Sequence, residues 1–446
     1  MTGLFAGVDI GTSRIKALAV DEAGRELGVA ERPTPWRRAE DGRTEIDPAR
    51  FPELAAAVAA EAAAAAGDAT GDTPRVLGLG VTGMAETGVL VDAAERPLAP
   101  SIAWHDPRGD VETIRRELGT EVFERTTGMR AGPLPSLAKL LWLRREHPET
   151  ARAVRFYSVG EWVVRRLGGE PVAELSLASR TGLLDLGTAR PWPAAAELLG
   201  GRVLLPEPVV AGTAAGRAAG DDVPAVLRGA VLTVAGHDHQ VAAYGVGAAT
   251  DGALFDSLGT AEALVRTVRP PLPPERVLAL TGRNVSVGWH VVPGHLCVLA
   301  GVPTGLTLRR IAAMLGVTTA EERAELGRRA LAEEGGHPTL RLVDPHDDHF
   351  GLAGITDDVT PARLWRAAAD GLAERAGEVL RHIDAQVGPC RRVVVGGGWL
   401  RDPVVHAAKR RHFPGMRTTD VTEPGAYGAA LLAAEATGLP IPPTEG

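Results

Sequence analysis

The sequence predicts an α/β protein built from two related domains. Three observations lead to this prediction: a length of 446 residues, strands that alternate with helices, and two similar hairpins about half a chain apart. A chain of this length exceeds what one hydrophobic core usually supports, so two domains of roughly 200 residues each are expected. We place the division after residue 245, which gives domains over 1–245 and 246–446.

The repeated element is an apolar strand, a Gly-Thr turn and a second, alternating strand. Its copies are GVDIGTSRIKALAVD over 7–21 and GALFDSLGTAEALVR over 252–266. Glycine lets the backbone approach an anion closely, and successive amides at such a turn can hold phosphate without a charged side chain. Two copies in one chain therefore predict two related domains facing one nucleotide.

Periodicity and end signals predict the other elements of the first domain. Asp47 and Pro48 form a helix start before an Ala-rich segment, because the carboxylate can accept from free amides and proline tolerates the first helical position. Strands are expected over 76–82 and 88–92 in a mixed sheet, and helices over 107–118, 136–145 and 159–167. A strand over 231–235 runs through GHDH into a small-residue helix over 241–247.

The second domain begins with the second hairpin. Helices are predicted over 306–315, 320–333 and 361–386, followed by a β-branched strand over 392–395. This strand runs into the glycines 396–398, and a last helix begins near Tyr427.

Bulk composition excludes several classes of partner. The net charge is -8 and the isoelectric point is near 5.9, with no basic stripe, which argues against nucleic acid and anionic membranes. The longest small apolar stretch is interrupted by Glu61 and is typical of a helix packed on a core. The first strand begins within a few residues of the N-terminus, so a secretory signal is not expected and the protein is predicted to be cytoplasmic. Cys297 and Cys390 have no close Cys/His ligand spacing and are expected to be free thiols.

Asp9 ends the first strand beside the turn Gly11-Thr12-Ser13. A carboxylate there could hold Mg²⁺ through water while the turn amides hold terminal phosphates, and Lys16 could reach the same oxygens. An Asp that opens a hairpin turn is common, so it is the pairing with the second turn that favours the phosphate site.

Phosphoryl transfer to a hydroxyl also needs a base, because an alcohol is a poor nucleophile until its proton is accepted. Asp238 is the candidate, since it follows an apolar strand at the edge where α/β sheets bind ligands. An ordinary helix cap is the structural alternative. His237 and His239 invite a metal-site interpretation, but no HExxH motif or second His/carboxylate cluster accompanies them.

A second polar set comprises Glu86, Trp104, Asp106 and Arg108. Carboxylates that accept several O–H donors, beside an aromatic face, suit a polyhydroxylated ligand. The alternative is that Asp106 and Arg108 pair to tie a loop. The glycines 396–398 could let adenine and ribose lie against the backbone, or form only a tight strand-to-helix turn.

Taken in order, these motifs resemble the FGGY family of carbohydrate kinases, within the actin-like ATPase superfamily. The resemblance spans nearly the whole chain. It is carried by DIGTS over 9–13, TEIDP over 44–48, WHDPR over 104–108, SLAKLLWLRRE over 136–146, GHDHQVAAYGVGA over 236–248, SLGTAE over 257–262, VVVGGGWLRDP over 393–403 and EPGAYGAALLA over 423–433.

The resemblance implies two ribonuclease H-like (actin-like ATPase) domains with a central cleft, and ATP-dependent phosphorylation of a hydroxyl of a sugar, sugar acid or polyol. The first domain would bind the acceptor and carry one phosphate hairpin, and the second would bind the nucleotide. Asp238 would be the catalytic base and Asp9 the Mg²⁺-associated carboxylate. The implied phosphate contacts are Gly11, Thr12, Ser13, Lys16, Gly259 and Thr260, and Gly397 and Gly398 would lie by the nucleoside.

Departures from the family pattern leave the acceptor open. Where glycerol kinases carry Arg-Glu the chain has Ala85-Glu86, and where pentulose kinases of the xylulose type carry Met-His it has Met84-Ala85. The expected partner is a small-molecule sugar, sugar acid or polyol, and a homodimer is compatible with the sequence. Two other functions stay open: an actin-like ATPase that acts as a sugar sensor or chaperone without phosphoryl transfer, and a metal-dependent hydrolase that uses the HDH residues.

Overall fold

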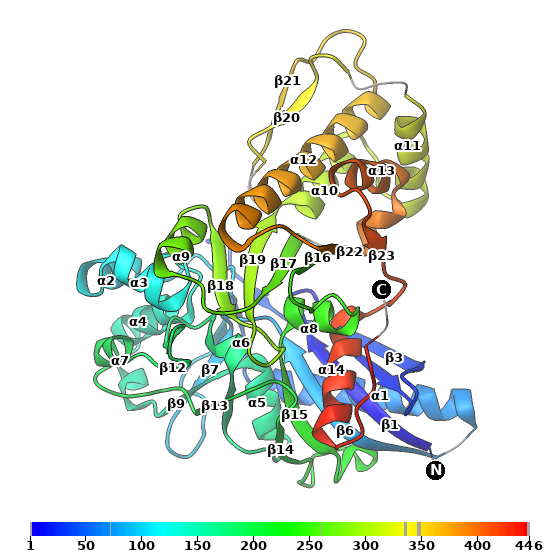
Figure 1. Ribbon diagram of the computed structural model, residues 1–446. Helices are drawn as coiled ribbons and strands as arrows, with labels where there is room; N and C mark the ends of the chain where they lie inside the picture. The colour runs from blue at the N-terminus through cyan, green and yellow to red at the C-terminus, as the bar shows by residue number, and fades with distance from the viewer. Residues whose placement is uncertain (1, 72, 260, 334–336, 346–348, 444–446) are drawn as a thin grey trace. The chain divides into compact units, whose positions relative to one another are not determined.

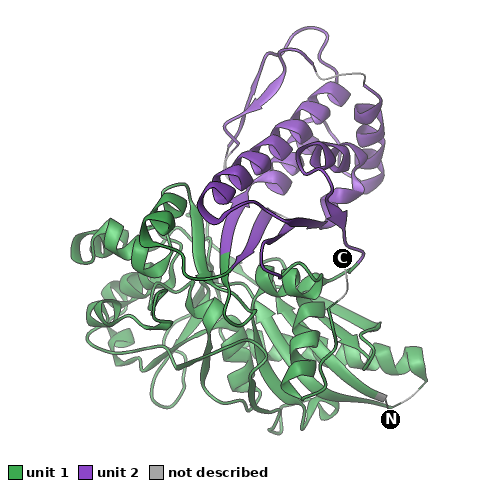
Figure 2. Ribbon diagram, in the orientation of Figure 1, with its two compact units in different colours: residues 1–249, 269–297, 421–445 green, residues 250–268, 298–420, 446 purple. Residues whose placement is uncertain are grey.

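The computed structural model describes residues 2–71, 73–259, 261–333, 337–345 and 349–443 (Figure 1). They form two compact units, coloured separately in Figure 2. Unit 1 contains the described residues of 1–249, 269–297 and 421–445, and unit 2 those of 250–268 and 298–420. The predicted division after residue 245 therefore differs from the compact units, because two later segments of the chain pack with unit 1.

Unit 1 is built on a six-stranded sheet, and its mixture of parallel and antiparallel pairs is the mixed sheet that the sequence predicted. Its strand β1 (Thr2–Ile10) pairs in parallel with β6 (Pro74–Gly83) and antiparallel with β2 (Arg14–Val20). Strand β6 also pairs in parallel with β15 (Val231–His237). The first predicted hairpin is therefore confirmed. In spatial order the strands are β14 (Ala214–Arg217), β15 (Val231–His237), β6 (Pro74–Gly83), β1 (Thr2–Ile10), β2 (Arg14–Val20) and β3 (Glu26–Pro33).

Two helices cover the two faces of this sheet: α1 (Arg50–Thr70) and α14 (Pro424–Ala436). Successive side chains of a strand point to opposite faces, so Leu4 and Ala6 pack in the cluster that contains α1, whereas Phe5 packs with α14. Gly7 lets α14 come close, since a Cβ there would lie 1.9 Å from the carbonyl oxygen of Ala426. The same alternation places Asp9 on the α14 face.

The middle of the chain forms smaller elements of unit 1. The expected helices are present as α2 (Val111–Glu117), α4 (Ser136–Glu146) and α5 (Val159–Arg166). Helix α2 begins later than predicted, because Asp110 caps its N-terminus by accepting from Thr113 N at 3.1 Å. The strand predicted over 88–92 is β7 (Gly88–Val91), but it pairs with β9 (Arg155–Ser158) outside the main sheet. Other elements of unit 1 are β4 (Arg37–Arg38), β5 (Thr44–Ile46), β8 (Ser101–Ile102), α3 (Thr120–Thr127), β10 (Val172–Glu174), α6 (Leu175–Ala178), β11 (Leu184–Asp185), β12 (Arg190–Pro191), α7 (Pro193–Leu198), β13 (Glu207–Val209), α8 (Asp238–Gly245), α9 (Pro274–Thr281) and β18 (Val285–Trp289).

Unit 2 repeats the core topology of unit 1. Its strand β16 (Ala253–Leu258) pairs antiparallel with β17 (Glu262–Val268) and in parallel with β22 (Arg392–Gly396), as β1 does with β2 and β6. The internal repeat expected from the two hairpins is therefore present in the strand pairing. Its strands lie in the order β19 (Leu296–Val302), β17 (Glu262–Val268), β16 (Ala253–Leu258), β22 (Arg392–Gly396) and β23 (Arg417–Thr418), with helices α10 (Thr304–Met314), α11 (Ala320–Ala332), α12 (Pro361–Val387) and α13 (Pro403–His412).

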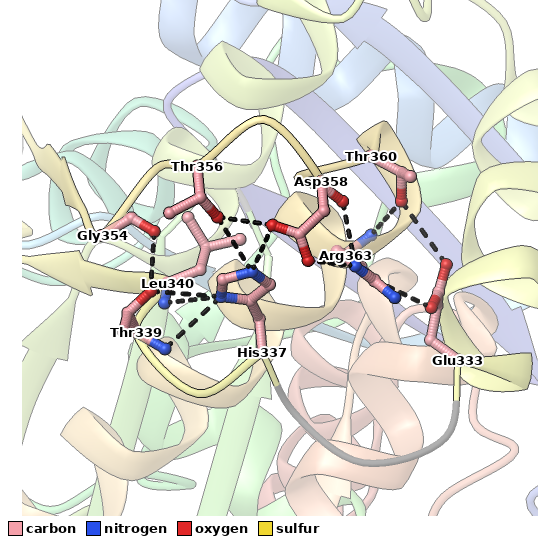
Figure 3. A network of polar contacts seen from close by, with 9 residues as sticks. All are labelled: Glu333, His337, Thr339, Leu340, Gly354, Thr356, Asp358, Thr360 and Arg363. Atoms are coloured by element: carbon pink, nitrogen blue, oxygen red, sulfur yellow. Dashed lines mark hydrogen bonds and ion pairs between the residues drawn. The ribbon is translucent and has the colours of Figure 1, made fainter.

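A polar network in unit 2 ties the segment after β21 (Gly351–Ala353) to the start of α12 (Figure 3). His337 Nδ1 accepts from Leu340 N at 3.0 Å, while His337 Nε2 lies 3.4 Å from Asp358 Oδ1. Arg363 then donates to Asp358 Oδ2 at 2.7 Å. Since Nδ1 accepts an amide hydrogen, the ring proton lies on Nε2, facing the carboxylate.

Among the residues that the structure describes, none of the helices combines the length and apolarity that a membrane-spanning segment requires.

Candidate functional site

The turn of the first hairpin, residues 11–13, is held by side chains from two other segments of unit 1. The Thr34 hydroxyl donates to the carbonyl oxygen of Gly11 at 2.8 Å, and Trp36 Nε1 donates to that of Thr12 at 2.7 Å. Trp104 Nε1 donates to Thr12 Oγ1 at 2.8 Å. These contacts fix the conformation of the turn, which is the preorganisation that an anion-binding backbone needs.

Asp9 lies against the start of α14. A Cβ at Gly425 would lie 2.4 Å from Asp9 Oδ2, so the first turn of the helix can approach this carboxylate because it carries glycine there. Asp9 Oδ1 is buried and has no hydrogen-bond partner among the described residues. Burial and the neighbouring Asp238 raise the pKa of Asp9 to about 7. An unsatisfied, buried carboxylate oxygen beside a second carboxylate fits the ligand that a divalent cation requires.

Asp238 is the first residue of α8, directly after β15. The helix predicted over 241–247 thus begins three residues earlier, and Asp238 lies at its start. Its Oδ1 accepts from His239 N at 2.7 Å and lies 3.3 Å from His237 Nε2. Burial opposes the charge, but His239, His237 and Arg180 outweigh it and lower the pKa of Asp238. The side chain is therefore a carboxylate at neutral pH, the form that a general base requires.

Lys16 is engaged by an acidic side chain that precedes α14. Its Nζ donates to Glu423 Oε2 at 2.6 Å, and each of the two side chains is about a quarter exposed. The role predicted for Lys16, contact with phosphate oxygens, therefore remains a prediction and would require this ion pair to open.

Glu86 is buried and pairs with Arg180, a residue that the sequence analysis missed. Arg180 Nε and Nη2 lie 2.6 and 2.5 Å from Glu86 Oε1, and Arg180 Nη1 also donates to Ser286 Oγ. Burial, opposed by Arg180, raises the pKa of Glu86. The backbone of Glu86 has φ of +60°, a conformation that non-glycine residues adopt rarely and that is enriched at functional sites.

Arg180 follows the short helix α6 in a segment with no recognised motif, so only the folded chain brings it to Glu86.

Asp106 and Arg108 bind each other, as the alternative interpretation of the sequence proposed. Arg108 Nη2 lies 2.7 Å from Asp106 Oδ2, and its Nη1 donates to Glu45 at 2.6 Å. Asp106 Oδ2 also accepts from Thr44 N at 2.6 Å. The two side chains are 0% and 9% exposed, so the pair ties the 104–108 loop to β5. Direct contact of these two residues with an acceptor stays a prediction.

Lys139 of α4 supports the segment that carries Trp104. Its Nζ donates to the carbonyl oxygens of Pro133 and Trp104 at 2.8 and 3.1 Å. Burial lowers the pKa of Lys139 to about 8. Trp104 itself remains partly exposed, at 36% of its surface, which suits an aromatic platform for a ligand.

In unit 2, the turn after β16 and the glycines after β22 pack together. Gly397 has φ of +110°, and a Cβ there would lie 2.3 Å from the carbonyl oxygen of Leu258. Gly259 N donates to Ala261 O at 3.0 Å, which closes the turn. Gly398 is exposed, with nothing within 4 Å of a Cβ. Thr260, predicted as a phosphate contact, lies outside the described residues.

A buried charged cluster lies at the base of this second turn and was not expected from the sequence. Lys409 of α13 contacts Asp256 Oδ2 at 2.8 Å and donates to Glu262 Oε1. Thr304 donates to the other oxygen of Glu262. All of these side chains are buried, so the cluster joins the hairpin to α13 and α10.

The HDH residues do not assemble a metal cluster of the hydrolase type. Burial lowers the pKa of His237 to about 3, and the ring packs edge-on against His239 with 5.5 Å between centroids. Within the described ranges, no group of three or more His, Cys, Asp or Glu side chains is placed to hold a metal ion.

Comparison with known proteins decides the family. The sequence model of the N-terminal domain of the FGGY family of carbohydrate kinases matches residues 4–245, more than half of the chain. The chain belongs to the FGGY family. Kinases of this family use ATP, and the chain is accordingly an ATP-dependent carbohydrate kinase whose acceptor group is an alcohol. An ATPase without transfer and a metal-dependent hydrolase are not favoured.

Relatives of this FGGY kinase match along almost its whole length. A glycerol kinase from Methylorubrum extorquens is 29% identical over 471 residues, covering 98% of this chain and 90% of the relative. A gluconokinase from Bacillus subtilis is 25% identical over 467 residues, covering 98% and 88%. The solved structure of a xylulose kinase from Rhodospirillum rubrum superposes with a TM-score of 0.84 at 24% identity, covering 98% and 91%. The predicted actin-like fold of the FGGY kinases is thereby confirmed.

Proposed function

We propose that this FGGY kinase transfers the γ-phosphoryl group of ATP to a hydroxyl of its acceptor with Asp238 as the general base. The observation that carries the proposal is the placement of Asp238 at the carboxyl end of β15, ionised and next to Asp9. The acceptor hydroxyl donates its proton to Asp238, its oxygen forms a bond to the γ-phosphorus, and ADP leaves with the electrons of the broken P–O bond.

Asp9 would hold Mg²⁺ in this proposal. Its unsatisfied Oδ1 and its location beside the Gly11-Thr12-Ser13 turn support the assignment. When bound, the cation supplies charge neutralisation for the phosphate oxygens. The proposed phosphate contacts are Gly11, Thr12 and Ser13 in unit 1 and Gly259 and Thr260 in unit 2. Gly11 N donates to Arg14 O and Gly259 N donates to Ala261 O, so these two glycines would contribute close approach of the backbone and not a free amide. Gly397 and Gly398 are proposed to contact the nucleoside.

Glu86 and Trp104 are the proposed acceptor contacts. Glu86 offers a carboxylate to acceptor hydroxyls, and Trp104 offers an exposed ring face to the C–H side of the molecule.

Substitution of the base tests the proposal. Asp238→Asn should retain ATP binding, measured by calorimetry, while the turnover in a coupled ADP assay falls by about 10²–10⁴-fold. Asp47→Asn, which removes an exposed carboxylate elsewhere in unit 1, is the matched control and should behave as the unsubstituted enzyme. Near-normal turnover by Asp238→Asn would reject the assignment.

A further inference from the structure

The segment that leads into Asp238 is held by hydroxyl groups from two other elements of unit 1. Ser176 Oγ, in α6, accepts a hydrogen bond from His237 N at 2.9 Å, and Thr82 Oγ1, in β6, donates to the carbonyl oxygen of Gly236 at 2.6 Å. Gly236 O and His237 N belong to the same peptide unit. Buried side chains therefore fix both polar atoms of this peptide unit, close to the proposed base.

Ser176 is itself held by a buried carboxylate. Its Oγ donates to Glu174 Oε2 at 2.5 Å, and the same oxygen accepts from Leu177 N at 3.1 Å. A hydroxyl group has one hydrogen, so its donation to Glu174 leaves the lone pairs of Ser176 Oγ for His237 N. Glu174 is anchored in turn, because its backbone N donates to Glu161 Oε1 at 2.8 Å. The serine hydroxyl thus has a fixed position and a fixed orientation.

Gly236 lets the strand β15 pass directly against these two side chains. Its φ is +111°, and a Cβ there would lie 2.7 Å from Ser176 Oγ and 3.0 Å from Glu174 Oε2. The register between β15 and β6 also shifts between Val234 and Gly236. Such irregularities change the direction in which the following side chains project, and they are over-represented beside active sites. The contacts of this segment with side chains therefore contribute to the position of Asp238, in addition to the strand ladder.

His237 connects this placement to the proposed base. The residue directly precedes Asp238, and its ring Nε2 lies 3.3 Å from Asp238 Oδ1. A shift of the His237 backbone would move both the start of α8 and the ring that contacts the carboxylate. A general base acts only within hydrogen-bond reach of the proton that it accepts, and a displacement of about 1 Å can cost about 100-fold in rate.

We propose that Ser176 and Glu174 are positioning residues for the general base: Glu174 orients the Ser176 hydroxyl, and this hydroxyl fixes the backbone that carries Asp238. The inference rests on the proposed function. Neither residue is a proposed contact of ATP or of the acceptor, so both act through Asp238. Their removal should lower kcat with little change in the KM for ATP, whereas a purely structural role predicts only a loss of stability.

Ser176→Ala tests the hydroxyl, because it removes the acceptor of His237 N. The coupled ADP assay uses the ketose, alditol or aldonate of three to six carbons that the unsubstituted enzyme phosphorylates fastest. It is run at pH 8, because burial raises the pKa of Glu174 to about 7 and the side chain is then mainly a carboxylate. The kcat should fall about 10–100-fold, while the KM for ATP stays within about 2-fold. An unchanged kcat in the folded variant would overturn the proposal.

A double-mutant cycle with Asp238→Asn shows whether Ser176 acts through the base. In the Asp238→Asn background, the further substitution Ser176→Ala should change the residual kcat by less than about 2-fold, because the base that it positions is already absent. An equal fold-loss in both backgrounds would overturn the proposal. Near-normal turnover by Asp238→Asn alone, or no phosphorylation of any acceptor by the unsubstituted enzyme, would instead reject the proposed function and the inference with it.

Glu174→Gln tests the carboxylate, and it takes the place of Ser176→Ala if that variant does not fold. It keeps the shape of the side chain but offers the Ser176 hydroxyl a neutral and weaker acceptor. The kcat should fall about 3–10-fold, and this loss should also disappear in the Asp238→Asn background. A folded Glu174→Gln variant with an unchanged kcat would overturn the role of Glu174.

Thr127→Val is the matched control, because Thr127 also has a buried hydroxyl that joins two backbone groups of unit 1. Its Oγ1 accepts from Met129 N at 3.3 Å and donates to the carbonyl oxygen of Phe123 at 2.8 Å. Urea denaturation of each variant measures the effect on stability, and Thr127→Val should keep kcat within about 2-fold. A loss of kcat as large as that of Ser176→Ala would show that removal of any buried hydroxyl is sufficient, and would overturn the specific role of Ser176.

Discussion

The indole nitrogen of Trp104 donates a 2.8 Å hydrogen bond to the hydroxyl of Thr12. This bond joins a residue proposed to contact the acceptor to the turn proposed to contact phosphate. Lys139 Nζ also donates to the carbonyl oxygen of Trp104 at 3.1 Å. Within unit 1, a hydrogen bond thus connects the proposed acceptor contact Trp104 directly to the proposed phosphate-binding turn.

Trp104→Phe tests this connection, because it keeps a smaller aromatic face and removes the Nε1–H donor. The variant should lose about 0.5–1 kcal/mol of coupling to Thr12, or roughly a 2–5-fold fall in kcat/KM for ATP. Thr12→Val and the double variant complete a double-mutant cycle. Strictly additive losses in kcat/KM would show that the hydrogen bond does not couple the two residues.

Two glycines after β22, Gly397 and Gly398, are expected to have different roles: Gly397 allows the backbone to fold tightly, and Gly398 is proposed to contact the nucleoside. Gly397→Ala should destabilise unit 2 by about 2 kcal/mol or more, because its φ is positive and the methyl group would strike Leu258 O. Gly398→Ala meets open space and should keep the unfolding midpoint of the unsubstituted protein. If Gly398 contacts the nucleoside, the KM for ATP should nevertheless rise about 10-fold in this variant. An unchanged KM would remove Gly398 from the nucleotide site.

The Lys409 cluster predicts a large stability effect in unit 2. Lys409→Met leaves Asp256 and Glu262 buried without their cation, which should lower the free energy of unfolding by about 3–5 kcal/mol in urea denaturation. Arg410→Met, an exposed position on the same helix, should change it by less than about 0.5 kcal/mol. Similar effects of the two substitutions would contradict a buried ion cluster.

Lys139 predicts a pH dependence of stability. Burial lowers its pKa in the folded protein from the ordinary 10.5 to about 8. Between pH 8 and pH 10.5, Lys139 is still protonated in the unfolded chain but already neutral in the folded protein. The buried charge therefore lowers the free energy of unfolding fully below pH 8, and this destabilisation declines as the pH rises above 8. The free energy of unfolding of the unsubstituted protein relative to Lys139→Met should therefore increase by about 2–3 kcal/mol between pH 7 and pH 10. A difference that does not vary with pH would refute the assignment.

Local signals predicted the two hairpins and the longer helices of the first part of the chain, but not most of the short strands or the pairing between distant strands. The hairpins have strong periodicity and form where expected. The Ala-rich helix α1 is also present, but it begins at Arg50 and not at the predicted Asp47-Pro48, because Asp47 Oδ1 accepts from Ala49 N in the turn before the helix. The strand β3 was not predicted, because its residues are mostly exposed and lack a clear apolar-polar alternation. The strand β7 was assigned to the wrong sheet, because its partner β9 lies far along the chain. The sequence also did not predict that unit 1 is built from three separate segments of the chain, one of which carries α14 from the last part of the sequence.

The amino-acid sequence by itself determined the family, the repeated hairpins and the positions of Asp9, Asp238 and Glu86, because each depends on neighbours within a few residues. Only the tertiary structure decided the electrostatics of these groups. The pKa of Asp9 rises because folding buries it beside Asp238, and Glu86 gains Arg180 from a segment with no motif of its own. Charge interactions depend on distance in space and on burial, and neither quantity is carried by the order of residues along the chain.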